Sequence, residues 1–231
     1  MKKIIRSFFY NPCIAKQISR ILAKIHQLSY LYLGSFASAA EGGLHPKHRL
    51  MDYHKFFVDN IMEGESVLDV GCGNGALLRD VVSKSKARAT GIELSEENCR
   101  DAKKRLTEFN EVKIIQEDIW KFNCNEYFDV IILSNVLEHL EKRTDLLKHL
   151  IRNFMPKKIL LRVPMFEREW LVPYKRELDI EWRLDPTHWI EYTEEEFQSE
   201  LAAAGLDIQK LIFRWGEMYA VAVPSSKERN A

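Results

Sequence analysis

Three glycines alternate with other residues directly after a short apolar segment, and this turn is well suited to bind a ligand. The sequence from Val67 to Gly75 reads Val-Leu-Asp-Val-Gly-Cys-Gly-Asn-Gly. Glycine tolerates positive φ and carries no Cβ atom, so a ligand can approach the main chain closely at Gly71, Gly73 and Gly75. A strand that ends in such a turn and continues into a helix is typical of the nucleotide-binding corner of an open α/β sheet.

An acid beside this turn indicates which kind of ligand fits. Gly71, Gly73 and Ala76 also match the dinucleotide pattern G-x-G-x-x-[GA], and Glu93 stands about 20 residues on, where that pattern places its ribose-binding acid. Asp69 precedes the glycines, however, and its carboxylate would repel a pyrophosphate but could hold a cationic group. We therefore favour a ligand that carries positive charge over a dinucleotide.

Four segments, taken together and in order, resemble the motifs of the class I S-adenosylmethionine (SAM)-dependent methyltransferases, in particular a small-molecule, type-11-like branch. They are Val67–Gly75, Ala89–Ser95 with its acid Glu93, the pair Asp118-Ile119, and Phe128–Leu140. The resemblance spans residues 46–223 of the chain. It implies an enzyme that uses SAM as its cofactor.

The resemblance also implies a set of cofactor-binding residues: Asp69, Gly71, Cys72, Gly73, Gly75, Glu93, Leu94, Asp118, Ile119, Ser134 and Asn135. The two carboxylate oxygens of Glu93 match the two hydroxyls of a ribose. Asp118 can accept a hydrogen bond from the adenine amine, and Asp69 would face the amino-acid part of the cofactor. Ser134 and Asn135 would line the methionine side.

Methyl transfer from a sulfonium requires alignment of the acceptor more than covalent catalysis. A base is needed only when the acceptor atom must lose a proton, and histidine suits that role near neutral pH. The candidate catalytic residues are His188, in Asp185-Pro-Thr-His188, and His139, which follows Glu138. Each could instead be a surface or packing histidine, and the pair Glu138-His139 resembles a family feature whose role is often structural. We expect no metal site.

Strand-like and helical segments alternate from residue 46 onward, which predicts a Rossmann-like α/β fold with a mostly parallel sheet and helices on both faces. The predicted strands are Ser66–Val70, Ala89–Glu93, Val112–Ile115, Phe128–Leu133, Lys158–Val163, Leu206–Phe213 and Glu217–Val223. Helical patterns cover His48–Met62, Gly75–Lys84, the segment capped by Ser95, and Lys142–Phe154. Thr193-Glu-Glu-Glu196 predicts a capping box. The resemblance implies that the last two of the seven strands form an antiparallel hairpin.

We predict three parts: a basic, amphipathic helical extension with a linker over residues 1–45, a methyltransferase domain over 46–224, and a tail over 225–231. An insert at 164–192 interleaves aromatic and basic residues: Phe166, Arg168, Trp170, Tyr174, Lys175, Arg176, Trp182, Arg183 and Trp189. In this fold such a position carries substrate caps. The side chains could stack on a sugar, a carboxylated ring or RNA bases, or could form an ordinary cap with its own small core.

Residues 1–40 contain the basic residues Lys2, Lys3, Arg6, Lys16, Arg20 and Lys24 and no acid. Apolar residues at helical spacing mark one face: Ile14, Ile18, Ile21, Leu22, Ile25, Leu28 and Tyr32. Two interpretations stay open, a helix packed on the catalytic domain and peripheral contact of residues 1–33 with an anionic membrane. The apolar runs are too short for a spanning helix, and basic residues interrupt any secretory signal. Gly34–Gly43 predicts a linker.

Bulk composition agrees with a soluble globular protein. The chain has 231 residues, is 46% hydrophobic and 29% charged, and has a formal net charge of zero. This neutral balance gives no support for nucleic acid as a partner. The cysteines at positions 13, 72, 99 and 124 show no C-x-x-C spacing, which predicts a reduced, cytoplasmic setting, with the inner membrane face left open.

The family members that methylate exocyclic base amines carry an Asn/Asp-Pro-Pro-aromatic motif after the fourth strand, where this chain reads Ser134-Asn-Val-Leu137. We therefore predict methylation of a small molecule or of a glycan or cell-envelope intermediate, at oxygen, by direct in-line transfer. Methylation of RNA and a non-catalytic SAM-binding protein stay as alternatives. The sequence assigns neither the acceptor nor the oligomeric state.

Overall fold

The computed structural model describes residues 11–43, 45–124 and 126–226, and these divide into two compact units. The smaller unit combines the described part of Met1–Met51 with Phe166–Pro186. The larger unit combines Asp52–Met165 with the described part of Thr187–Ala231 and contains the sheet. The basic residues Lys2, Lys3 and Arg6, and positions 227–231 of the predicted tail, lie outside the described residues. The predicted domain boundaries stay a prediction.

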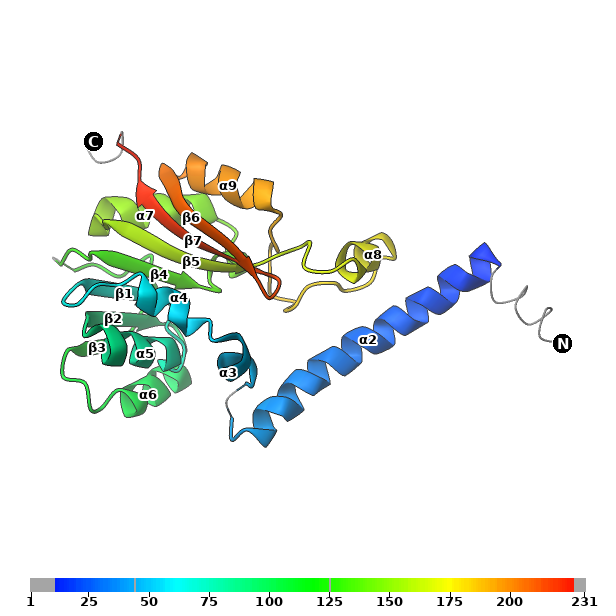
Figure 1. The fold of residues 1–231 in the computed structure, drawn as a ribbon, viewed down its shortest axis with the longest axis horizontal. Helices are drawn as coiled ribbons and strands as arrows, with labels where there is room; N and C mark the ends of the chain where they lie inside the picture. The colour runs from blue at the N-terminus through cyan, green and yellow to red at the C-terminus, as the bar shows by residue number, and fades with distance from the viewer. Residues whose placement is uncertain (1–10, 44, 125, 227–231) are drawn as a thin grey trace. The chain divides into compact units, whose positions relative to one another are not determined.

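A seven-stranded sheet with the order β3-β2-β1-β4-β5-β7-β6 forms the centre of the larger unit (Figure 1). Its strands are β1 (Ser66–Val70), β2 (Arg88–Glu93), β3 (Val112–Gln116), β4 (Val130–Ser134), β5 (Lys158–Pro164), β6 (Leu206–Arg214) and β7 (Glu217–Pro224). Strands β1 to β5 pair in parallel, whereas β7 is antiparallel to both β5 and β6. The predicted Rossmann-like fold and its antiparallel C-terminal hairpin are confirmed.

Helices before and between the strands cover both faces of the sheet. They are α4 (His54–Asp59), α5 (Ala76–Ser85), α6 (Glu96–Arg105), α7 (Arg143–Phe154) and α9 (Glu194–Ala203). Helix α5 packs with α4 and α6, while α7 packs with α9 on the other face (Figure 1). The chain moves from β1 toward one edge of the sheet through β2 and β3, and toward the other edge through β4 and β5. Because each crossover between parallel strands is right-handed, the helices of the two halves lie on opposite faces.

Local signals fix where several helices begin and end. Ser95 caps α6 by accepting a hydrogen bond from Asn98 N at 3.3 Å. The predicted capping box at Thr193 is present. The Thr193 hydroxyl accepts a hydrogen bond from Glu196 N, and the Glu196 carboxylate accepts one from Thr193 N. The helix predicted over His48–Met62 was wrong as one element, because Asp52 takes a φ of 46° and separates α3 (Lys47–Met51) from α4.

The central strands are buried on both sides, as parallel strands between two helical layers must be. Leu68 of β1, Ile131 of β4 and Leu161 of β5 are completely buried in one apolar cluster. The same cluster contains Phe154 of α7 and Phe197 of α9. The rigid sheet that results holds the carboxyl ends of its strands in place.

A buried ion pair ties the antiparallel strand β7 to the parallel part of the sheet. The Arg162 guanidinium donates two hydrogen bonds to the Glu217 carboxylate, at 2.7 and 2.6 Å. The Tyr219 hydroxyl donates to the same carboxylate at 2.7 Å, and the Tyr53 ring lies 3.7 Å from the guanidinium carbon. This bidentate, fully engaged geometry is what makes a buried ion pair tolerable.

The smaller unit is built on α2 (Pro12–Ala40), with α3 and α8 (Leu171–Glu177). The linker predicted at Gly34–Gly43 was wrong over most of its length, because α2 continues through Gly34 to Ala40. Alanine has the highest helix propensity, and one glycine costs only about 1 kcal/mol, so the small residues of this segment allow the helix to continue.

Helix α2 contacts the insert through one side. Ala23 is buried against Leu178 and Ile180, and Gln27 both donates to the Arg183 carbonyl at 3.2 Å and accepts from Lys175 at 2.7 Å.

The predicted apolar face of α2 lies on the other side of the helix. Ile25 is turned roughly 200° from Ala23 at 100° per residue. Ile21, Leu22, Ile25, Leu28 and Tyr32 are 57 to 59% exposed. Among the described residues, none of the helices has both the length and the apolar character that a membrane crossing requires.

Candidate active site

The glycine turn between β1 and α5 is attached to the neighbouring strand. Gly71 N and Cys72 N both donate to the Ile92 carbonyl, at 2.8 and 3.0 Å. A Cβ atom added at Gly73, which has a φ of 54°, would meet nothing within 4 Å. At Gly75 an added Cβ atom would stand 3.0 to 3.2 Å from α6 and the residue that caps it. Gly75 therefore allows helix packing, whereas Gly73 leaves the main chain open to a ligand.

Glu93, at the end of β2, holds the turn from its other side. Its Oε2 atom accepts from Gly73 N at 2.9 Å, and its Oε1 atom accepts from Ser95 N at 2.8 Å. Each carboxylate oxygen has a second lone pair, so Glu93 can still accept hydrogen bonds from a ligand. Leu94 beside it is 69% exposed, whereas the Cys72 side chain is buried.

Asp69 is buried without compensation, and this is the strongest sign of a ligand. Its side chain is 1% exposed, and its Oδ2 atom has no hydrogen-bond partner in the described part of the chain. Burial, together with the nearby Glu93 carboxylate, raises the pKa of Asp69 to about 8. A cationic ligand group would relieve the cost of burying this carboxylate.

The predicted residues after β3 and β4 reach the same edge of the sheet. Asp118 accepts a hydrogen bond from Trp120 N at 3.0 Å, and Ile119 is buried in the core. Ser134 accepts from Arg162 at 3.5 Å. Asn135 has a φ of 56°, and its buried Oδ1 atom lacks a hydrogen-bond partner within the described ranges. The carboxyl ends of parallel strands meet at one edge of the sheet, so the predicted cofactor residues all lie at or next to that edge.

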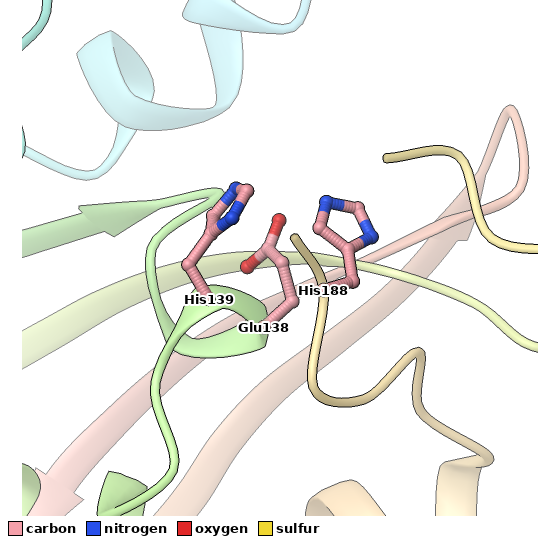
Figure 2. Close-up of side chains that lie close together, drawn as sticks. All are labelled: Glu138, His139 and His188. Carbon is pink, nitrogen blue, oxygen red and sulfur yellow. The ribbon is translucent and has the colours of Figure 1, made fainter. Parts of the chain in front are cut away.

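The two candidate bases come together beside this edge, with Glu138 between them (Figure 2). Glu138 and His139 lie on the short 3₁₀ helix η1 (Leu137–His139) that follows β4, and His188 comes from the chain that returns after the insert. The two imidazole rings are 4.6 Å apart between centroids. His139 is exposed to solvent, whereas His188 is 6% exposed.

Glu138 is a second buried carboxylate at this edge. It is completely buried, and neither carboxylate oxygen has a hydrogen-bond partner in the described part of the chain. Burial raises the pKa of Glu138 to about 8. Sequence reasoning singled out the pair with His139 but contained no signal that this carboxylate is buried.

Hydrogen bonds attach the returning chain to η1. Trp189 N donates to the Glu138 carbonyl at 2.7 Å, and the Thr187 hydroxyl lies 2.9 Å from His139 Nδ1. His188 Nδ1 lies 2.9 Å from a carboxylate oxygen of Glu191, which is 2% exposed. Sequence reasoning missed Thr187, because its contact with His139 joins segments 48 residues apart in the chain. It also missed Glu191, which lies only three residues from His188 but carries no motif that marks it as a partner.

The aromatic residues of the insert pack partly on one another. The Phe166 and Trp182 rings meet edge to face at 5.0 Å, and the Arg176 guanidinium lies 5.3 Å from the Phe166 ring. Trp170 is 75% exposed, and Trp189, next to His188, is 64% exposed. The insert thus has a small core of its own and also presents aromatic surface.

The family described as "Methyltransferase domain" matches residues 44–211, which is more than half of the chain. Together with the seven-stranded fold and the glycine turn, this match shows that the chain belongs to the class I SAM-dependent methyltransferases, a family of enzymes.

Two curated relatives act on small molecules according to their names. An (S)-coclaurine N-methyltransferase of Thalictrum flavum is 30% identical over 130 residues, which cover 49% of this chain and 36% of the relative. A ubiquinone biosynthesis O-methyltransferase of Salmonella paratyphi A is 28% identical over 127 residues, covering 50% of this chain and 52% of the relative. The alignments span only about a third to a half of these relatives.

A solved structure shares the fold. The chain of a SAM-dependent methyltransferase from Aquifex aeolicus superposes with a TM-score of 0.59 at 17% identity, over 77% of this chain and 92% of that chain.

The buried Asp69 carboxyl predicts a pH-dependent stability. Between its unfolded pKa of about 3.9 and its folded pKa of about 8, the folded ligand-free protein holds a proton that the unfolded chain has lost. The free energy of unfolding should therefore fall as pH rises through this window. Relative to Asp69→Asn, the wild type should lose up to about 1.4 kcal/mol per pH unit in urea unfolding between pH 5 and about 8.

The matched control is Asp118→Asn, which keeps an oxygen to accept from Trp120 N. It should change the free energy of unfolding by less than about 0.5 kcal/mol. Equal pH slopes for the wild type and Asp69→Asn would contradict the prediction.

Proposed function

We propose that this protein binds SAM and transfers its methyl group to an oxygen atom of a small molecule or of a glycan or cell-envelope intermediate. The single observation that carries the cofactor assignment is Asp69, a buried carboxylate with an unpartnered oxygen beside an open glycine turn. SAM bears a cationic sulfonium and an ammonium group, either of which would complement this charge. When bound, SAM supplies an activated methyl group on the sulfonium sulfur.

In this proposal, different residues at this edge of the sheet contact different parts of the cofactor. Glu93 accepts from the ribose hydroxyls while it also holds Gly73, and Leu94 covers the adenosine. Asp118 accepts from the adenine amine, with Ile119 behind the ring. Asp69 faces the amino-acid part, and Ser134, Asn135 and the main chain at Gly71, Cys72, Gly73 and Gly75 complete the site.

Oxygen is favoured as the methylated atom because of the two histidines. An amine acceptor can lose its proton to water, whereas a hydroxyl benefits from a group that takes the proton or stabilises the anion. Because Glu191 accepts from His188 Nδ1, a neutral His188 carries its lone pair on Nε2. The exposed Trp189 beside it provides a face on which an acceptor ring could stack.

Two alternatives lack a comparable observation. RNA methylation is not favoured, because the formal net charge is zero. A non-catalytic SAM-binding protein would not need the clustered histidines. We also place the protein in the cytoplasm, because all four cysteines are free thiols.

The cofactor assignment can be tested by calorimetric titration with S-adenosylhomocysteine. The wild type should bind it, and Glu93→Ala should weaken the affinity at least tenfold, since the ribose contact and the anchor of Gly73 are lost together. Glu97→Ala, on the exposed first turn of α6, is the control and should bind normally. Binding of NADH in place of S-adenosylhomocysteine would refute the assignment.

The histidines can be tested once an acceptor is found by transfer of labelled methyl from SAM into a small-molecule extract. His188→Ala should lower kcat by a factor of about 10² or more while the affinity for S-adenosylhomocysteine stays unchanged. Unchanged turnover would remove His188 from the reaction.

We further propose that α2 lies on an anionic membrane surface. Its exposed apolar side chains lie on a helix that also carries the exposed cations Lys16, Arg20 and Lys24, the pattern of an interfacial helix. The contacts with Leu178, Ile180 and Arg183 use the opposite side of α2, so both can exist together.

The full chain should therefore sediment with phosphatidylglycerol vesicles and not with phosphatidylcholine vesicles. Ile25→Glu should abolish sedimentation, because it places a charge in the apolar face. His26→Glu adds the same charge about 100° around the helix and should retain most of the binding. Equal binding by both variants would contradict a role for this face.

A further inference from the structure

Contrary to the expectation from the sequence, we propose that Glu138, His139 and His188 form a binding site for one divalent first-row transition-metal cation. The choice of these three ligands is argued from the geometry of the site alone. The role of the ion rests on the proposed function, namely activation of an acceptor hydroxyl for methyl transfer.

The three side chains point toward one another (Figure 2). Each offers one ligand atom, and these atoms all lie within 4.8 Å of one another. Neighbouring ligands on an ion with bonds of about 2.1 Å stand roughly 3.0 to 3.4 Å apart. A small side-chain rotation would therefore close the three ligands around an ion.

The buried carboxylate is the observation that calls for a cation. Glu138 has no hydrogen-bond partner for either oxygen among the described residues, and a buried charge in that state is strongly unfavourable. The nearby guanidinium of Arg162 is already engaged by two hydrogen bonds to Glu217. A metal ion would neutralise Glu138 directly.

The histidines are oriented as metal ligands usually are. A ligating imidazole commonly donates its second ring N–H to a carboxylate or another acceptor, which fixes the tautomer and the ring. Here Nδ1 of His188 is held by the buried Glu191, and Nδ1 of His139 lies beside the Thr187 hydroxyl. The Nε2 atom of His188 then carries the lone pair that a metal requires.

The ligand types indicate the class of ion. Two imidazoles and one carboxylate suit Mn²⁺, Fe²⁺, Co²⁺ or Zn²⁺, whereas Mg²⁺ and Ca²⁺ prefer sites made of oxygen ligands alone. Three protein ligands leave further coordination positions for an acceptor. His139 is exposed, so an acceptor can reach the site from solvent.

Such an ion would make the histidines ligands rather than free bases. Coordination lowers the pKa of a bound hydroxyl, whose proton passes to water. The resulting oxygen attacks the methyl carbon, and the carbon–sulfur bond breaks with its electron pair staying on sulfur. The products are a methyl ether and a neutral thioether, so no oxidant or reductant is required.

Cobalt alone is a suitable probe, because its visible absorption reports nitrogen and oxygen ligands. The untagged full-length protein, freed of metal by a chelator and then of the chelator, should bind one Co²⁺ per chain with new visible bands. Glu138→Gln, His139→Ala and His188→Ala should each weaken binding by about tenfold or more. His149→Gln, on α7 outside the cluster, should bind like the wild type.

Calorimetry with S-adenosylhomocysteine on the same variants separates the two proposals. Unchanged binding shows that each variant is folded and that the cofactor site is intact. Loss of cobalt binding in the three variants, with the cofactor still bound, supports the metal site. A wild type that binds S-adenosylhomocysteine but gives no cobalt bands, or bands that the three variants leave unchanged, overturns the metal site and leaves the proposed function standing.

Discussion

The structure depends on an energetic cost concentrated at one edge of the sheet, where buried polar groups lack partners. Asp69, Asn135 and Glu138 follow or end two adjacent central strands, and each has a buried oxygen without a hydrogen-bond partner in the described part of the chain. Each such group costs on the order of 1 to 3 kcal/mol. A ligand that supplies the missing partners would offset this cost, so the three residues mark this edge of the sheet as a binding site more strongly than any single motif.

The rest of the fold holds these groups in place. Leu68 and Ile131 are completely buried on the two strands concerned, so neither strand can shift without opening the core. The Arg162–Glu217 ion pair continues this support across β5 and β7, and the Arg162 carbonyl accepts from Asn135 N at 2.9 Å. The polar edge is therefore preorganised by an apolar core and one fully engaged ion pair, which is the arrangement that methyl transfer requires.

The two compact units divide the work in the proposed function. The larger unit contains the glycine turn, the buried carboxylates and the histidine cluster, so cofactor and chemistry both belong to it. In the smaller unit, α2 contacts the insert through Ala23 and Gln27. The two segments are more than 140 residues apart in sequence. This union gives the insert a scaffold of its own and leaves the apolar side chains of α2, such as Ile25 and Leu28, exposed.

The sequence by itself determined the elements whose signals are local. Alternating strand and helix patterns predicted the sheet, the glycines predicted the turn after β1, and Thr193 with Glu196 predicted a capping box, because each depends on residues close together in the chain. Only the tertiary structure decided the rest. It buried Glu138 and brought His139 together with Thr187 and with His188, which Glu191 holds. Contacts between segments about 50 residues apart join His139 to Thr187 and His188, and no spacing in the sequence encodes which partners will meet or which carboxylate will lose its water.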